Sequence, residues 1–426
     1  MGAFAQPAPG LSLGAMNAGI KTSRRLLLIV LAVLGVLPAC AHAGFGPPQA
    51  LSGPDDGVTR ADGVVGGDGV RTVAWYADAG AGSTEFAKLA ADGTVAERGT
   101  IAAGSGGEPQ LVAEPGGDVL AIWRRSEDLA FATIHPDGSV GPIHSAPVEA
   151  QDFAAIAGAD GATQVAVVVH ARHERSLVVQ SLEIAHGSAS APRPVSDLKE
   201  LAFDVQLGLE PDGTLHIAWT QVNGGAGREV HATTIDRSGH IGPMQTLFKG
   251  LVGAESVIGV HDDIVVAERD WPKGDAIEVG RFSGASRQAK FEPTSRIRLR
   301  GFESQGATAF AADGSGFIAW QGENGIGGAA VSRRGIAAHP HVISDDAKVR
   351  SPVVAVDAGG AAAVGWRGRG RSFSVSDVKP NGHPAKPEEL APESSQRVLF
   401  AGRKTPLTAL WISGEGRQLF AAGAGG

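Results

Sequence analysis

A repeat with a period near 48 residues runs through most of this chain and limits the folds it can adopt. In most units a turn carrying Gly or Asp is followed by Trp, or by an apolar residue, six or seven residues later, and in the last unit Lys404 stands seven residues before Trp411. One unit has Glu at the equivalent position, but its distance along the chain from the neighbouring units still fits the repeat period. The positions that mark the units are Trp75, Trp123, Val167, Trp219, Glu268, Trp320, Trp366 and Trp411. Such self-similarity indicates one supersecondary unit repeated along the chain.

The fourth unit shows most clearly what each repeat contains. Four strands are expected there, at residues 205–210, 214–220, 229–235 and 240–248. The first two are separated by Pro211-Asp212-Gly213, a turn in which Gly supplies a positive φ. Ile217 and Trp219 share one face of the second strand because side chains alternate along a strand. A four-stranded sheet with apolar residues on both faces must be covered on both sides, so each unit needs two neighbours.

The two ends of the repeat region complement each other. The last unit has expected strands near residues 397–401, 407–412 and 417–421, and lacks a fourth. Residues 45–51 match residues 241–247, the fourth strand of the fourth unit. Pairing residues 45–52 with residues 417–424 would close a ring and remove exposed sheet edges. We therefore predict an all-β fold, a β-propeller of eight four-stranded blades closed by the N-terminal strand, with seven blades as the alternative.

These repeats resemble the secreted bacterial β-propeller proteins that are built from degenerate sialidase-like repeats. The resemblance covers about residues 45–426. It rests on segments such as residues 211–219, PDGTLHIAW, and residues 312–320, ADGSGFIAW. The Asp-box of true sialidases, Ser-x-Asp-x-Gly-x-x-Trp, is absent, because Gly and Trp are here six residues apart. The resemblance therefore implies an architecture and leaves the activity open.

Residues 1–43 are expected to be a signal peptide. Three basic residues precede an apolar run at residues 26–37, which is too short to span a bilayer comfortably. Ala41-His42-Ala43 fits a signal-peptidase site, which leaves residues 44–426 as a single β-propeller domain. Met16 is an alternative start of the chain. We expect an exported protein, extracellular or at the cell surface, with no transmembrane segment after leader cleavage.

Two other interpretations of the leader stay open. Residues 23–27 resemble a twin-arginine signal, although the strongly apolar run fits the general secretory route better. Residues 37–40 resemble a lipobox, in which Cys40 would be lipidated and would anchor a lipoprotein. Cys40 is the only cysteine, so a secreted fold of this size would depend on a large core or on closed sheets rather than on disulfides.

The charge of the chain limits its partners. The formal net charge is −8, and removing the leader, which holds three basic residues and no acid, leaves −11. This balance argues against nucleic-acid binding, which depends on neutralising phosphates with Lys and Arg. We expect a monomer.

No residue set forms a recognisable catalytic or metal site, so we predict no catalytic residues, no metal ligands and no cofactor. In the family that the repeats resemble, an enzyme would use a Tyr nucleophile with a Glu partner. Tyr76, the only Tyr, follows Trp75 with Glu85 nearby, but we interpret it as an aromatic residue at a strand end. His339-Pro340-His341 places two imidazoles on one side of an extended segment without a third ligand in view.

The strongest surface signal is basic. Arg alternates with other residues in the connection that enters the sixth unit and again in the loop after Trp366. These residues are Arg296, Arg298, Arg300, Arg367, Arg369 and Arg371. In a propeller both connections emerge on the same face. Because Arg presents a planar fork suited to carboxylate or phosphate groups, we predict a binding site for an anionic glycan, an envelope polymer or a protein.

Two functions stay open. The first is an exported, non-catalytic β-propeller that acts as a binding or interaction scaffold through loops on one face. The second is a carbohydrate-active hydrolase or lyase, with acids and Arg from different blades meeting at the central opening. The lack of an acid–base or metal constellation favours the first, so the interpretation leans away from an enzyme.

Overall fold

The structure, a computed structural model, falls into two compact units, Met1–Ala41 and His42–Gly426. The described residues all belong to the second unit; they are 43–90, 92–171, 176–196, 201–223, 227–247, 255–269, 276–283, 290–299, 306–337, 339–401, 407–414 and 417–425. Residues 1–42 of the expected leader, with Met16 and Cys40, lie outside them, as does Arg300; Ala43, its expected last residue, is the first residue of a described strand. Across these ranges no helix is both long enough and apolar enough to cross a membrane.

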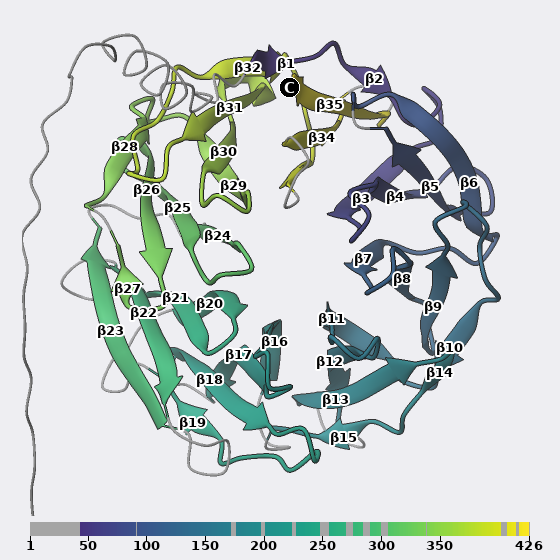
Figure 1. The fold of residues 1–426 in the computed structure, drawn as a ribbon, viewed down its shortest axis with the longest axis vertical. Helices are drawn as coiled ribbons and strands as arrows, with labels where there is room; N and C mark the ends of the chain where they lie inside the picture. The colour runs from purple at the N-terminus through teal and green to yellow at the C-terminus, as the bar shows by residue number, and fades with distance from the viewer. Residues whose placement is uncertain are drawn as a thin grey trace, which may run out of the picture. The chain divides into compact units, whose positions relative to one another are not determined.

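The unit His42–Gly426 consists of strands joined into sheets, and among its described residues every pairing but one is antiparallel (Figure 1). The first sheet contains β3 (Val58–Val65), β4 (Arg71–Ala77), β5 (Ser83–Leu89) and β6 (Val95–Ala103). The second contains β7 (Pro109–Ala113), β8 (Val119–Arg124), β9 (Leu129–Ile134) and β10 (His144–Ala146). The next repeat contributes β11 (Ala150–Ala157), β12 (Thr163–His170), β13 (Leu177–Ala185), β14 (Ser188–Ala189) and β15 (Arg193–Pro194). The repeat after it contributes β16 (Leu201–Leu209), β17 (Leu215–Asn223), β18 (Gly227–Ile235) and β19 (Gln245–Thr246).

The remaining repeats follow the same order. The fifth contains β20 (Glu255–His261), β21 (Ile264–Arg269), β22 (Ala276–Ser283) and β23 (Lys290–Arg298). The sixth contains β24 (Gly306–Phe310), β25 (Gly316–Gly322), β26 (Gly325–Ser332), β27 (Gly335–Ile336) and β28 (His341–Ser344). The seventh contains β29 (Arg350–Val356), β30 (Ala362–Arg367), the short 3-10 helix η2 (Arg369–Arg371), β31 (Phe373–Val378) and β32 (Glu388–Ala391). The last contains β33 (Arg397–Phe400), β34 (Thr408–Ile412) and β35 (Leu419–Gly425), with β1 (Ala43–Phe45) and β2 (Gln49–Ala50).

The first strand of each repeat contacts the first strand of the next. Among the described strands these contacts run through β3, β7, β11, β16, β20, β24, β29 and β33 and return to β3. We call these the inner strands. A closed cycle of antiparallel sheets confirms the predicted β-propeller. The number of blades stays a prediction, because the third and fourth repeats share one nine-stranded sheet, joined through the single pairing of Leu177 with Leu201.

The predicted closure between the two ends of the repeat region is confirmed. β1 and β2 both pair antiparallel with β35, with Phe45 opposite Ala424 and Ala50 opposite Phe420. The Leu51 N–H donates to the Leu419 carbonyl at 2.8 Å. N-terminal residues therefore complete the last sheet, and its edge is not left open.

The Trp residues lie between neighbouring sheets, as predicted. Trp123, Trp219, Trp320 and Trp366 are all buried. Trp219, for example, packs with Ala166 and Val168 of the preceding repeat. The repeat of Trp at this position thus supplies one large side chain to each of these interfaces, and the core is a series of interfaces between sheets rather than one central cluster.

Two expectations about single units are wrong. The fourth strand expected at residues 240–248 is reduced to β19 and an isolated bridge between Ile235 and Ile241. Glu268 is not the equivalent of the Trp residues, because it lies on the strand face of Ile264 and Val266, which packs on the following sheet. The cause is the hairpin before it: His261 pairs directly with Ile264, so the turn is shorter and the strand presents its other face.

Candidate functional site

The two ends of the inner strands offer different chemistry. β29 begins at Arg350 and ends at Val356, and Val356 and Asp357 border a large cavity. β33 begins at Arg397, and Ala401 after its last residue borders the same cavity. One end of these strands therefore carries Arg, and the other end faces the cavity.

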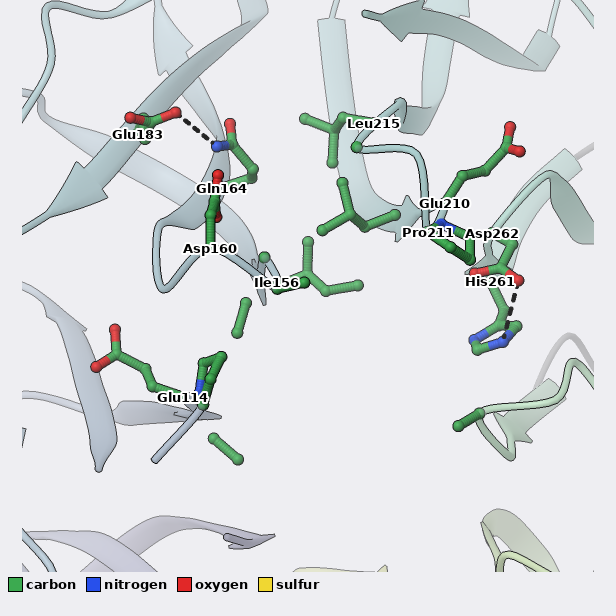
Figure 2. Close-up of a pocket in the computed structure, with 18 of the residues that line it drawn as sticks. Glu114, Ile156, Asp160, Gln164, Glu183, Glu210, Pro211, Leu215, His261 and Asp262 are labelled. Carbon is green, nitrogen blue, oxygen red and sulfur yellow. Dashed lines mark hydrogen bonds and ion pairs between the residues drawn. The ribbon is translucent and has the colours of Figure 1, made fainter. Parts of the chain in front are cut away.

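The cavity has a volume of about 1440 Å³ and is lined by turns that follow the inner strands, together with residues of β12, β13 and β15 and of the turn after β18. Figure 2 shows carboxylates from several repeats, among them Glu114, Asp160, Glu210 and Asp262, arranged around this space together with Ile156 and Leu215. A ligand pocket usually has a volume of roughly 300–1,000 Å³, so the space is large enough for a small molecule.

The lining of the cavity is acidic. It includes nine Asp and Glu side chains and two Arg, Arg193 and Arg237, within the described part of the chain. Much of this acidity is turn chemistry: Asp68, Asp160 and Asp212 each accept the N–H of a residue two positions later, at 2.9, 3.1 and 2.8 Å. The excess of carboxylates is expected to disfavour anions and to accept hydrogen bonds from hydroxyl or ammonium groups.

Among the described residues that line the cavity, His261 is the one with an imidazole. Its Nε2 lies 3.8 Å from an Asp262 oxygen, a contact drawn in Figure 2. Burial lowers the pKa of His261, and the Asp262 charge opposes that shift. Asp262 is also paired with Arg333. This network neutralises Asp262 and holds the short turn that reverses the chain between β20 and β21.

At the opposite end of the strands, three Arg residues gather from the seventh and eighth repeats. Arg350 and Arg367 are partners across β29 and β30. The charge of Arg367 acts on Arg397, the first residue of β33. We call Arg350, Arg367 and Arg397 the arginine group.

Arg397 is the most constrained member of this group. Its guanidinium donates to the Ser394 hydroxyl at 3.3 Å, and its Nε is buried without a partner. Burial and then the neighbouring Arg367 charge lower the pKa of Arg397 to about 10. In the part of the chain that the structure describes, neither Arg367 nor Arg397 has an acidic partner. Two like charges therefore lie close together without a counter-ion.

The predicted six-arginine site is only partly assembled. Arg296 and Arg298 lie in the outermost strand β23 rather than in a connection, because Ile297 between them is buried and the strand pairs with β22. Three members of the predicted set already have acidic partners: Arg296 with Glu278, Arg369 with Asp346 at 2.8 Å, and Arg371 with Glu393 at 3.8 Å.

A group of carboxylates lies near the corresponding ends of strands in the fourth and fifth repeats. Burial raises the pKa of Glu268 to about 7, while a hydrogen bond from the Gly306 N–H opposes the shift. Burial also raises the pKa of Asp204, assisted by the charge of Asp152 and opposed by that of Arg228. A carboxyl that is partly protonated at neutral pH can donate as well as accept a proton.

Tyr76 is the next-to-last residue of β4, close to the strand end where it was expected. Its cross-strand partners are Arg60 and Thr84, and Glu85 is opposite Trp75, so Tyr76 is not directly opposite the acid that a sialidase-like nucleophile would need. It borders a smaller depression of about 420 Å³ together with Glu108 and Arg124.

The sequence interpretation missed Arg350 and Arg397. Both begin the first strand of their repeat, and they are separated by 47 residues, close to the repeat period. A comparison of equivalent positions in consecutive repeats could have found them. Neither Arg has another Arg within two residues, unlike the alternating Arg of residues 296–300 and 367–371.

No protein-family model matches the sequence, and no curated relative matches it. Solved structures are similar in fold. An ulvan lyase of a polysaccharide lyase family, bound to -[GlcA(1-4)Rha3S]-, is 10% identical, with 90% of this chain and 95% of that chain covered and a TM-score of 0.50.

Two further structures have the same kind of similarity. Prolyl oligopeptidase B of Galerina marginata is 10% identical, with 84% of this chain covered and a TM-score of 0.50; this chain spans about half of that protein, 55% of its length. The periplasmic gluconolactonase of Pseudomonas aeruginosa is 14% identical, with 73% of this chain and 93% of that chain covered and a TM-score of 0.45. At these identities the similarity concerns the fold.

Proposed function

We propose that this protein is a non-catalytic β-propeller that binds an acidic polymer, such as a glycan carrying carboxylate or sulfate groups, through the arginine group. The observation that carries the proposal is the pair Arg367 and Arg397, which lie close together without an acidic partner among the described residues. An anion bound between them would relieve their repulsion and satisfy the buried Nε of Arg397.

The rest of the molecule agrees with this choice. The cavity at the other end of the inner strands is lined mainly by carboxylates and would repel the same ligand. The leader expected in residues 1–43 would export the protein, which would place the arginine group among envelope or extracellular polymers. The remaining predicted residues Arg298, Arg369 and Arg371 would add a weaker, screened attraction.

The test is a binding measurement with defined polymers at two salt concentrations. Polygalacturonate carries carboxylates, dextran sulfate carries sulfates, and dextran is the neutral control. We expect binding to the two acidic polymers, weakened by salt because exposed charges are screened over roughly 8 Å at physiological ionic strength. Arg367→Gln should weaken binding by about tenfold or more, which is the usual scale for one charge-assisted hydrogen bond.

Arg298→Gln is the matched control, because it removes one exposed positive charge in a different repeat. If Arg298→Gln weakens binding as much as Arg367→Gln, attraction is a property of the net charge rather than of the arginine group. Absence of binding to either acidic polymer would refute the proposal. Polymer binding by Arg397→Gln should be compared with that of the parent at a temperature well below the unfolding midpoint of the variant. Arg397 is half-buried, so the substitution is expected to lower stability as well.

A second candidate, a hydrolase or lyase acting on carbohydrate, is favoured by one observation. Glu268 has a pKa of about 7 and is near Asp204 and Arg228, so an acid–base group and a cation come from neighbouring repeats. Turnover of chromogenic glycosides or depolymerisation of an acidic glycan, lost in Glu268→Gln while binding persists, would favour this candidate over a binding scaffold.

A further inference from the structure

Where neighbouring sheets meet on their outer side, a side chain of one sheet covers a turn of the next. The covered turn joins the third and fourth strands and contains a Gly with positive φ. A side chain built on this Gly would meet the covering residue. The pairs are Glu97 with Gly138, His144 with Gly187, Arg193 with Gly239 and His341 with Gly382.

The pair between the sixth and seventh repeats brings two imidazoles together. His341 is the first residue of β28, and His383 follows Gly382 in the turn between β31 and β32. Their ring centroids are 4.6 Å apart, with an angle of 51° between the planes. His341 is half-buried and His383 is exposed. Solvent therefore has access to the pair.

Backbone hydrogen bonds hold both residues in place. The Gly382 N–H donates to the Lys379 carbonyl at 2.8 Å, and the Lys379 N–H donates to the His383 carbonyl at 3.0 Å. Gly382 has a φ of +87°, a conformation that favours Gly. His341 is opposite Gly328 in the pairing of β28 with β26. The approach of the two rings is thus set by the backbone of two repeats.

We propose that His341 and His383 form a two-histidine site for a divalent first-row transition metal ion such as Zn²⁺, Ni²⁺ or Cu²⁺. Neutral imidazole nitrogen is a preferred ligand of these ions. Two nitrogens bound to one ion at 2.0–2.1 Å lie about 3 Å apart when the ligands are adjacent. Rings whose centroids are 4.6 Å apart can reach that arrangement by small side-chain rotations.

The site has two protein ligands, and water completes the coordination. The described residues include no metal-binding group of three or more His, Cys, Asp or Glu side chains. His339, two residues before His341, is exposed and belongs to no such group. A bound ion would connect the sixth and seventh repeats on their outer side and stabilise the folded protein by mass action.

The equivalent pair between the second and third repeats supplies a natural control. There His144 covers Gly187, and His186 precedes that Gly. The His144 ring stacks on Phe131 instead, with centroids 5.6 Å apart and an angle of 25°. It follows that His144 should not contribute to metal binding, although it occupies the same kind of position.

The test uses the full chain without a polyhistidine tag. Calorimetric titration with NiCl₂ should give one site per chain. His341→Ala and His383→Gln should each weaken binding at least tenfold, and His144→Ala should bind as the parent does. With Cu²⁺, electron paramagnetic resonance should show coordination by two nitrogens in the parent and by one in His383→Gln. NiCl₂ should also raise the unfolding temperature of the parent but not of His383→Gln.

His383→Gln keeps the test independent of folding, because His383 is exposed on a turn. Absence of a saturable site in the parent would overturn the proposal. Equal affinity in the parent and in both single variants would overturn it as well, because the ion would then be held elsewhere.

Discussion

The guanidinium of Arg193 lies over Gly239 in the turn of the following repeat and donates a hydrogen bond to the Gly239 carbonyl oxygen. Gly239 has a φ of +79°, so this turn needs Gly for its own conformation as well as for the approach of Arg193. The repeated turn Gly is therefore part of the contact between sheets and not only a feature of each hairpin.

Gly239→Ala should destabilise the protein by about 1–2 kcal/mol, because a non-Gly residue at positive φ is strained. Gly67→Ala is the control, since a Cβ there meets nothing within 4 Å and φ is not in the positive range. The unfolding free energies of both variants are compared by urea titration. Equal values would show that the conformation at Gly239 is not costly for Ala.

Trp219→Ala should cost about 3–5 kcal/mol of unfolding free energy, because it leaves a cavity between two sheets. The indole is fully buried and its Nε1 donates to the Gln221 side chain at 2.7 Å. Trp219→Phe should cost less, since it keeps most of the volume. Because the chain has seven Trp, iodide quenching is compared between the parent and Trp219→Phe; a strongly quenched signal that is lost with Trp219 would contradict the burial on which this prediction depends.

Deleting residues 44–52 should lower the unfolding temperature and promote aggregation. The deletion removes β2 and most of β1 and exposes the edge of β35. It also removes Ser52, whose hydroxyl accepts the Leu419 N–H at 3.0 Å. Thermal unfolding and light scattering are the measurements. A truncated protein that unfolds at the parental temperature without aggregating would show that closure contributes little.

Stability should depend on pH through Glu268. Burial raises the pKa of Glu268 from 4.5 to about 7, so the folded state binds this proton more tightly than the unfolded state. Its contribution is fully present below pH 4.5 and is lost as pH rises through 7. The loss is at most about 3 kcal/mol. The contribution of Glu268 is obtained from the difference in unfolding free energy between the parent and Glu268→Gln, measured from pH 4.5 to 8. A difference that stays constant over this range would contradict the prediction.

Arg369→Gln should change little. The guanidinium is paired with Asp346, and Arg369 is exposed, so solvent screens the pair and it contributes little to stability. We expect Arg369→Gln to weaken binding to polygalacturonate less than Arg367→Gln does. The reverse order would locate the anion site at η2 rather than at the arginine group.

Much of the fold could be predicted from the sequence because the repeat is carried by local chemistry. A turn Gly with positive φ and a Trp six residues later recur in most units. In each unit both residues belong to the same hairpin, so the hairpin can be recognised from residues that are close in sequence. The match between residues 45–51 and residues 241–247 identified the strand that completes the last sheet. The third and fourth repeats could not be separated into blades in this way, because their connection depends on one pairing between Leu177 and Leu201.

The candidate site could be predicted only in part: the repeat period could have marked Arg350 and Arg397 as equivalent positions, but no spacing in the sequence shows which charged residues meet. The sequence identified Arg367 as one of a run of Arg, but only the tertiary structure placed Arg350 and Arg397 beside it. It also paired Arg296 with Glu278, which no spacing indicated. The sequence by itself determined the repeat, its turns and the closing strand, since these depend on residues near one another. The tertiary structure decided which charges meet, because ring closure brings together strands that are distant along the chain.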